Sequence, residues 1–115
     1  MNIEAISLYN LKDTPVNFEG GDEIIKIKTP DHEDGFGVIV KNENAVTDAE
    51  IIIKGGNSVM AMGDIAVNVP KGEEVLINLK DTGRFKNVYG EDAGYIVLNV
   101  EKVSGADISV FAFGL

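Results

Sequence analysis

One triplet in the chain has the sequence of a catalytic motif. Asp81-Thr82-Gly83 spells the signature of aspartic proteases, in which two carboxylates share one proton. Lys80 and Arg84 place a cation on each side, which favours an ionised carboxylate and opposes that shared-proton state. The chain also lacks the partner motif that supports the protease loop. We therefore interpret Asp81-Thr82-Gly83 as a polar turn that follows a strand.

A second segment has the residue types of a cation site. Asp31-His32-Glu33-Asp34-Gly35 contains three carboxylates and the one histidine of the chain. Calcium loops space their oxygen ligands at alternating positions over about twelve residues, and zinc sites need several His or Cys residues. The segment is best explained as a solvated turn after Pro30, and an opportunistic cation site stays open as the alternative. A Ser-His-Asp triad is not indicated, since the chain has no Gly-x-Ser-x-Gly motif.

Paired glycines could cradle a phosphate group if they led into a helix. Gly20-Gly21 and Gly55-Gly56 end segments instead, and the chain has neither a Walker lysine nor a Gly-x-Gly-x-x-Gly motif. We expect these glycines to form turns at positive φ.

The segment Arg84-Phe85-Lys86-Asn87-Val88-Tyr89 combines two cations with two aromatic rings. In one interpretation Phe85 and Tyr89 pack into the end of the fold, and Arg84 and Lys86 lie outside. In the other, this loop is a contact surface, because Arg and Tyr dominate interface hot spots and a basic loop on an acidic protein attracts an acidic partner. The candidate partner-contact residues are Arg84, Phe85, Lys86 and Tyr89. No catalytic, cofactor-binding or metal-binding residue is predicted.

These segments lie between short stretches with the period-two alternation of half-buried strands. Strands are predicted over residues 24–28, 36–41, 49–54, 65–69, 75–79, 95–103 and 107–113, with 58–62 as a further candidate. The last two should form a hairpin turned at Ser104-Gly105. No helical periodicity is sustained over three turns. The sequence predicts an all-β fold, a single immunoglobulin-like or jelly-roll-like β-sandwich of seven to eight short antiparallel strands.

The length of 115 residues and the 44% hydrophobic composition predict one domain over residues 1–115. Residues 1–20 lack alternation, so they form either a first edge strand or an arm on the domain or on a neighbour. The absence of cysteine suits a reducing compartment such as the cytosol. The net charge of −9 disfavours nucleic acid and anionic membranes as partners, and we expect neither an export signal nor a membrane-spanning helix.

The order of several segments resembles small proteins encoded in the structural-gene clusters of tailed bacteriophages and prophages, namely their capsid decoration or head auxiliary proteins. The likeness extends from about residue 36 to 115, and Gly83-Arg84-Phe85-Lys86 is its most specific part. The other segments are residues 36–42, 53–57, 63–72, 90–92 and 94–98.

The resemblance implies a non-enzymatic virion protein that needs no cofactor. Such a protein is made in the cytoplasm of the host bacterium, binds the outer surface of the assembled lattice of major capsid protein, and stabilises it in many copies. Self-association of the chain stays open. Two alternatives remain: a head-tail or tail-tube component, and a carbohydrate-binding β-sandwich module, although the chain has no tryptophan for a sugar-stacking platform.

Overall fold

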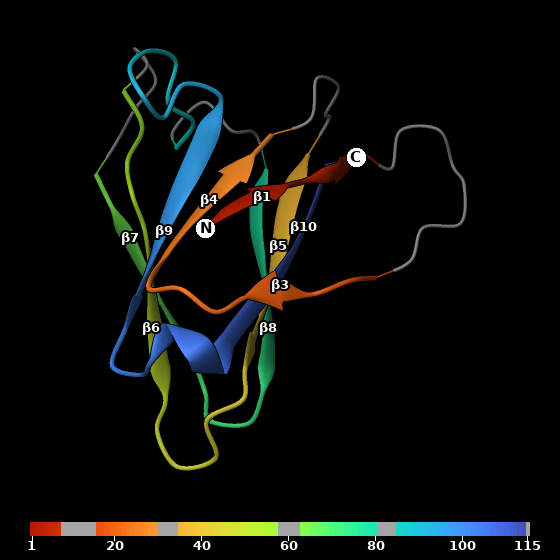
Figure 1. The fold of residues 1–115 in the computed structure, drawn as a ribbon, viewed down its shortest axis with the longest axis vertical. Coiled ribbons are helices and arrows are strands. Elements are labelled where there is room, and N and C mark those ends of the chain that lie inside the picture. The colour runs from red at the N-terminus through yellow and green to blue at the C-terminus, as the bar shows by residue number, and fades with distance from the viewer. Residues whose placement is uncertain (8–15, 30–34, 58–62, 81–84, 115) are drawn as a thin grey trace.

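The computed structural model describes residues 1–7, 16–29, 35–57, 63–80 and 85–114, which form an all-β fold (Figure 1). The one helical element in these residues is the short 3₁₀ helix η1 (Gly105–Asp107). The strands are β1 (Asn2–Glu4), β2 (Ile6–Ser7), β3 (Glu19–Gly20), β4 (Ile24–Lys28), β5 (Phe36–Asn42), β6 (Ala49–Ile53), β7 (Ile65–Val69), β8 (Glu74–Lys80), β9 (Tyr95–Glu101) and β10 (Ile108–Gly114).

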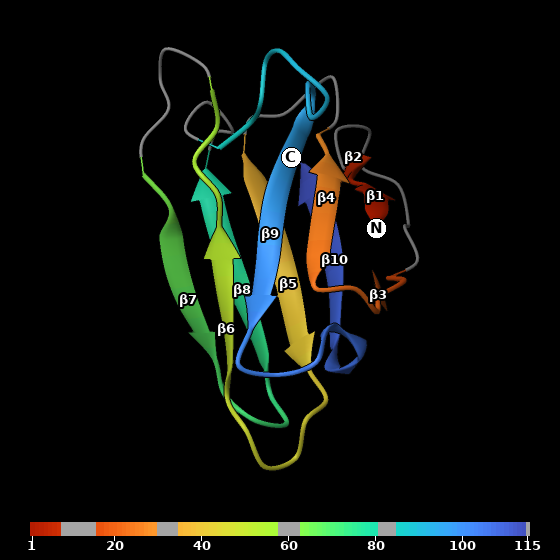
Figure 2. The ribbon, with the colours of Figure 1, turned by 60° about the vertical axis from the view of Figure 1, so that its left-hand side comes forward.

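The strands form two five-stranded sheets. One sheet has the order β1-β4-β9-β6-β7, and the other has the order β2-β10-β5-β8, with β3 pairing beside β2 on the same edge of β10. Figure 2 shows the two sheets as two layers, with β7, β6, β9 and β4 in front of β8, β5 and β10. The all-β prediction is therefore confirmed at the level of fold class.

Alternating side chains on the strands supply the core between the layers. On β4, Ile25 and Ile27 are fully buried while Lys28 is exposed, as expected for a strand with one wet face. The two strands with continuous apolar runs, β5 and β6, lie inside their sheets. The buried hydrophobic cluster extends from Ile3 to Ala112 and contains side chains from both sheets.

The number and direction of the strands differ from the prediction. The described residues contain ten strands, and β1–β4 and β2–β10 pair in parallel. The additional strands lie in the first twenty residues, where β1, β2 and β3 are each two or three residues long. Strands this short cannot produce a recognisable alternation. Residues 2–7 thus pair with both sheets at one edge of the molecule, where the Ala5 N–H donates to the Lys28 carbonyl oxygen (2.9 Å).

The predicted terminal hairpin is wrong. β9 pairs with β4 and β6, whereas β10 pairs with β5, β2 and β3 in the other sheet. The connection carries the chain across the core through Lys102, which has a positive φ of 71°, and then through η1. Gly105 packs so closely on the Asp22 backbone that an added Cβ would collide with it. Two adjacent alternating strands therefore belong to different layers.

Candidate functional site

The loop over residues 85–94, called here the 85–94 loop, connects the region after β8 to β9 at one end of the molecule (Figure 1, cyan). Phe85 is buried and belongs to the core cluster, and Lys86 is half-buried. Val88 and Tyr89 are exposed at 55% and 66%. The loop therefore combines a buried aromatic anchor with an exposed apolar and aromatic tip. Arg84, the fourth predicted contact residue, lies outside the described residues.

The tip is held by one side chain that the sequence analysis did not single out. The Asn57 amide donates from Nδ2 to the Tyr89 carbonyl oxygen (2.9 Å) and accepts at Oδ1 from the Val88 N–H (2.7 Å). The donor and the acceptor of the Asn57 amide thus hold the backbone of two consecutive residues, Val88 and Tyr89. The side chains of these two residues point outward. Each such hydrogen bond stabilises by roughly 0.5–1.5 kcal/mol net.

Gly56 allows the two segments to approach. An added Cβ at Gly56 would collide with the carbonyl group of Lys86 and the backbone of Phe85. The expectation of turns at positive φ holds for Gly21 (φ 118°) but not for Gly20 or Gly56. At both of those positions the missing side chain makes room for another backbone, because Gly20 packs in the same way on Ile108.

A third contact anchors the segment that carries Asn57. Asp64 accepts from Lys54 Nζ (2.7 Å) and from the Gly55 N–H (2.7 Å), so it ties the residues after β6 to the start of β7. The hydrogen bond from Lys54, followed by that from Gly55, lowers the pKa of the Asp64 carboxyl below its usual value of 3.8. Asp64, Gly56 and Asn57 together form a continuous support beneath the exposed tip.

The base of the 85–94 loop is closed on β9. The Asn87 N–H and its side-chain amide both donate to the Tyr95 carbonyl oxygen (3.0 and 3.1 Å), and the Gly94 N–H donates to Asn87 O (2.7 Å). Asp92 accepts from Lys26 Nζ on β4 at 2.7 Å. The hydrogen bond to Asp92 is the main cause of the raised pKa of the Lys26 ammonium. The loop is therefore a hydrogen-bonded platform rather than a long free connection.

The other sequence candidates for chemistry lie outside the described residues, namely 81–83 of the protease-like triplet and 31–34 of the acidic segment. Within the residues that the structure describes, no three His, Cys, Asp or Glu side chains gather as a metal site would require. No helix in these parts of the chain has the length and apolar character needed to cross a membrane.

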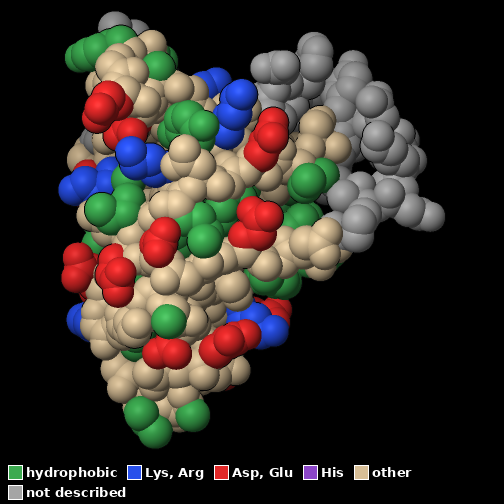
Figure 3. Space-filling view, viewed as in Figure 1, with side chains coloured by type: hydrophobic (Ala, Val, Ile, Leu, Met, Phe, Trp, Pro, Cys, Tyr) green, Lys and Arg blue, Asp and Glu red, His purple; other side chains and the backbone are tan. Residues whose placement is uncertain are grey.

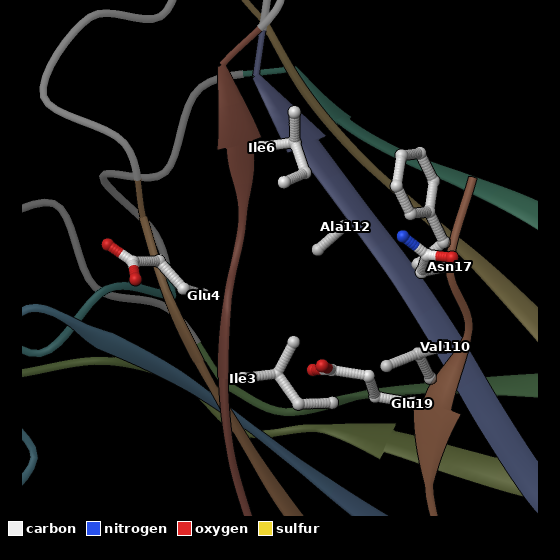
Figure 4. A pocket seen from close by; sticks show the side chains of 8 residues that line it. Ile3, Glu4, Ile6, Asn17, Glu19, Val110 and Ala112 are labelled. Carbon is white, nitrogen blue, oxygen red and sulfur yellow. The ribbon is translucent and has the colours of Figure 1, made fainter. Parts of the chain in front are cut away.

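A small pocket of about 120 Å³ lies at the edge of the second sheet that β2 and β3 form. It is located where β10 stops pairing with β3 and begins pairing with β2. Its walls are polar and apolar in similar measure, and Figure 4 shows the Glu19 carboxylate reaching into it while Glu4 points away. The two carboxylates do not face one another, so they do not form an acid/base pair. The lining residues are Ile3, Glu4, Ile6, Asn17, Glu19, Val110, Phe111 and Ala112.

The surface charge follows the composition. Figure 3 shows acidic side chains spread over the viewed face, with Lys side chains between them. A net charge of −9 on such a surface opposes contact with a phosphate backbone.

Comparisons of this chain with protein-family models, with curated proteins and with solved structures gave no match.

Proposed function

We propose that this chain is a non-enzymatic structural protein of a bacteriophage virion, which binds the outer surface of the assembled capsid and stabilises it. The single observation that carries the proposal is the exposed Val88–Tyr89 tip, fixed by Asn57 on a hydrogen-bonded loop. A tip that is already ordered loses little conformational entropy on binding. In the same proposal the two sheets form one β-sandwich of the immunoglobulin-like or jelly-roll-like kind.

The contact surface in this proposal consists of Tyr89, Val88 and Lys86, with Arg84 as a further contact from the adjoining segment. Phe85 acts differently, because its ring is buried and anchors the loop in the core. A tip of this size gives a weak single contact. Binding to a lattice compensates for this, since a protein that bridges several arrayed subunits gains effective concentration from each further contact.

Co-sedimentation tests the function directly. The protein is mixed with assembled capsids, and separately with unassembled capsid subunits, of the major capsid protein encoded in the same phage or prophage gene cluster. We expect it to sediment with the assembled capsids and to raise the temperature at which they fall apart. Binding to neither form would contradict the proposal, and closed rings of the protein by itself would favour a head-tail component instead.

A matched pair of valine variants tests the site. Val88 lies on the 85–94 loop. The control residue is Val46, an exposed valine (79% accessible) in the connection from β5 to β6 at the opposite end of the molecule (Figure 1). We expect Val88→Asp and Tyr89→Ala each to weaken capsid binding by about ten-fold or more, as for a residue at the centre of an interface. Val46→Asp should bind like the unmodified protein. Equal binding by all three variants would place the contact elsewhere.

A further inference from the structure

The pocket beside β10 arises from the way two short strands pair with it. β3 pairs with β10 up to Val110, and β2 begins to pair with it at Phe113. On this edge no described strand pairs with Phe111 or Ala112, which lie between the two pairings. Ile3 of β1 lines the same gap from the first sheet. The pocket is therefore an opening between the two sheets.

The floor of the pocket is the edge of the hydrophobic core. Ile3 comes from the first sheet, whereas Val110 and Ala112 come from the second. All three side chains are buried and belong to the core cluster. A group that enters the pocket thus places its inner end against apolar side chains of both sheets, which favours a hydrocarbon body there.

One carboxylate reaches into the pocket without a described cation to balance it. Figure 4 shows this carboxylate on Glu19, whereas the side chain of Glu4 points away. None of the ion pairs among the described residues includes Glu19. Because part of its surroundings is apolar, the carboxylate attracts a cation more strongly than a carboxylate that water surrounds on all sides.

The single carboxylate and the volume limit the kind of cation that fits. A calcium ion needs six to eight oxygen ligands, more than one carboxylate supplies. An apolar cavity of about 150 Å³ holds benzene, so the pocket of about 120 Å³ holds roughly five non-hydrogen atoms. Four carbons and one nitrogen, as in butylammonium, meet this limit. Asn17 lines the same pocket, and its amide oxygen gives the ammonium a second acceptor.

We propose that the pocket binds a primary alkylammonium group, with the nitrogen at Glu19 and the hydrocarbon chain against Ile3 and Ala112. This chemistry has two sources, a free small amine and the lysine side chain of another protein. The inference is independent of the function proposed for the 85–94 loop, because the pocket and the loop share no residue.

Titration of the full chain with n-butylammonium chloride tests the proposal. The amide signals of Val110 and Ala112 are followed by NMR, and sodium chloride keeps the ionic strength constant. We expect a saturable shift with a dissociation constant in roughly the millimolar range, as suits a ligand of this size. n-Butanol has the same hydrocarbon chain without the charge, so it should bind at least about five-fold more weakly.

A matched pair of glutamate variants locates the charge contact. Glu19→Gln keeps the size of the side chain and removes its charge, so it should weaken n-butylammonium binding by about five-fold. Glu4→Gln removes the same charge from a residue that lines the same pocket but points away, and its affinity should stay within about two-fold of the unmodified protein. Both side chains are exposed, so the fold should tolerate both changes.

Nα-acetyl-lysine methylamide separates the two sources, because it carries the same butylammonium group on a peptide backbone. Binding as tight as that of n-butylammonium would identify a lysine side chain, and binding of the free amine alone would identify a small amine. The proposal is overturned if no saturable shift occurs, if n-butanol binds equally well, or if Glu19→Gln keeps full affinity. An equal loss in both glutamate variants would also overturn it, since the attraction would then come from the net charge.

Discussion

At the scale of single residues, the candidate site depends on side chains with no catalytic character. Asn57 holds the backbone of Val88 and Tyr89, and Asp64 holds the segment that carries Asn57. Sequence patterns identified the aromatic residues of the loop because their types are distinctive. They did not identify Asn57, because an asparagine after two glycines is typical of any turn.

Asp64 makes the stability of this support depend on pH. Because its pKa is lower in the folded protein than the usual 3.8, its contribution is complete above pH 3.8 and is lost as the pH falls through the folded value. We expect the free energy of unfolding of the unmodified protein to fall more steeply below pH 3.8 than that of Asp64→Asn.

Denaturant unfolding at neutral pH and at a pH of about 3 measures this difference. Glu101→Gln, which removes one negative charge at the exposed end of β9, is the control. If Asp64→Asn and the unmodified protein lost stability in parallel, the proposed role of the Lys54 and Gly55 hydrogen bonds would be wrong.

At the scale of elements, strands with a clear alternation were predictable and short strands were not. The predicted ranges 24–28 and 65–69 coincide with β4 and β7. The ranges for β5 and β6 differ by one residue at one end, and those for β8 and β10 differ by one residue at each end. β9 ends at Glu101, two residues earlier than predicted. β1, β2 and β3 were missed as separate strands because two or three residues pair only where a neighbouring strand is already in place.

Gly56 sets how closely the segment after β6 approaches the 85–94 loop, and a pair of alanine variants measures its importance. Gly56→Ala should destabilise the protein by about 1–3 kcal/mol, because the added Cβ collides with the backbone of Phe85 and Lys86. A change of side-chain rotamer cannot relieve a collision with backbone atoms. Gly63→Ala should change stability by less than about 0.5 kcal/mol or raise it slightly, since nothing lies near its added Cβ.

Chemical denaturation of both variants gives the comparison. Amide exchange at Val88 provides a second readout, which should become faster in Gly56→Ala as the loop loses its support. Equal stability of the two variants would show that the loop tolerates displacement at this point.

At the scale of the whole molecule, Asn42 joins the two sheets. It is buried at the end of β5, and its side-chain amide donates toward the carbonyl oxygens of Thr47, Val69 and Pro70 (3.1, 3.2 and 3.5 Å). Val69 belongs to β7 of the other sheet. One polar side chain in an apolar core thus fixes how the layers meet at this end.

Asn42→Asp keeps the shape of this side chain and removes its only donor. A carboxylate facing three carbonyl oxygens should destabilise the protein by about 3–5 kcal/mol at neutral pH, and less at acidic pH where the carboxyl is protonated. Thermal and denaturant unfolding test this, with the exposed Asn68→Asp on β7 as the matched control, expected within about 0.5 kcal/mol. A similar loss in both variants would contradict the role given to Asn42.

The sequence by itself determined the all-β class and the positions of seven strands, because alternation of apolar side chains is a local property that each strand carries in its own residues. Only the tertiary structure decided which sheet each strand joins, and it separated β9 from β10 because pairing depends on distant partners. The same holds for the candidate site. Tyr89 is exposed and Phe85 is buried although both are aromatic residues of one loop, since Asn57 and Gly56, some thirty positions earlier, decide which ring meets the core.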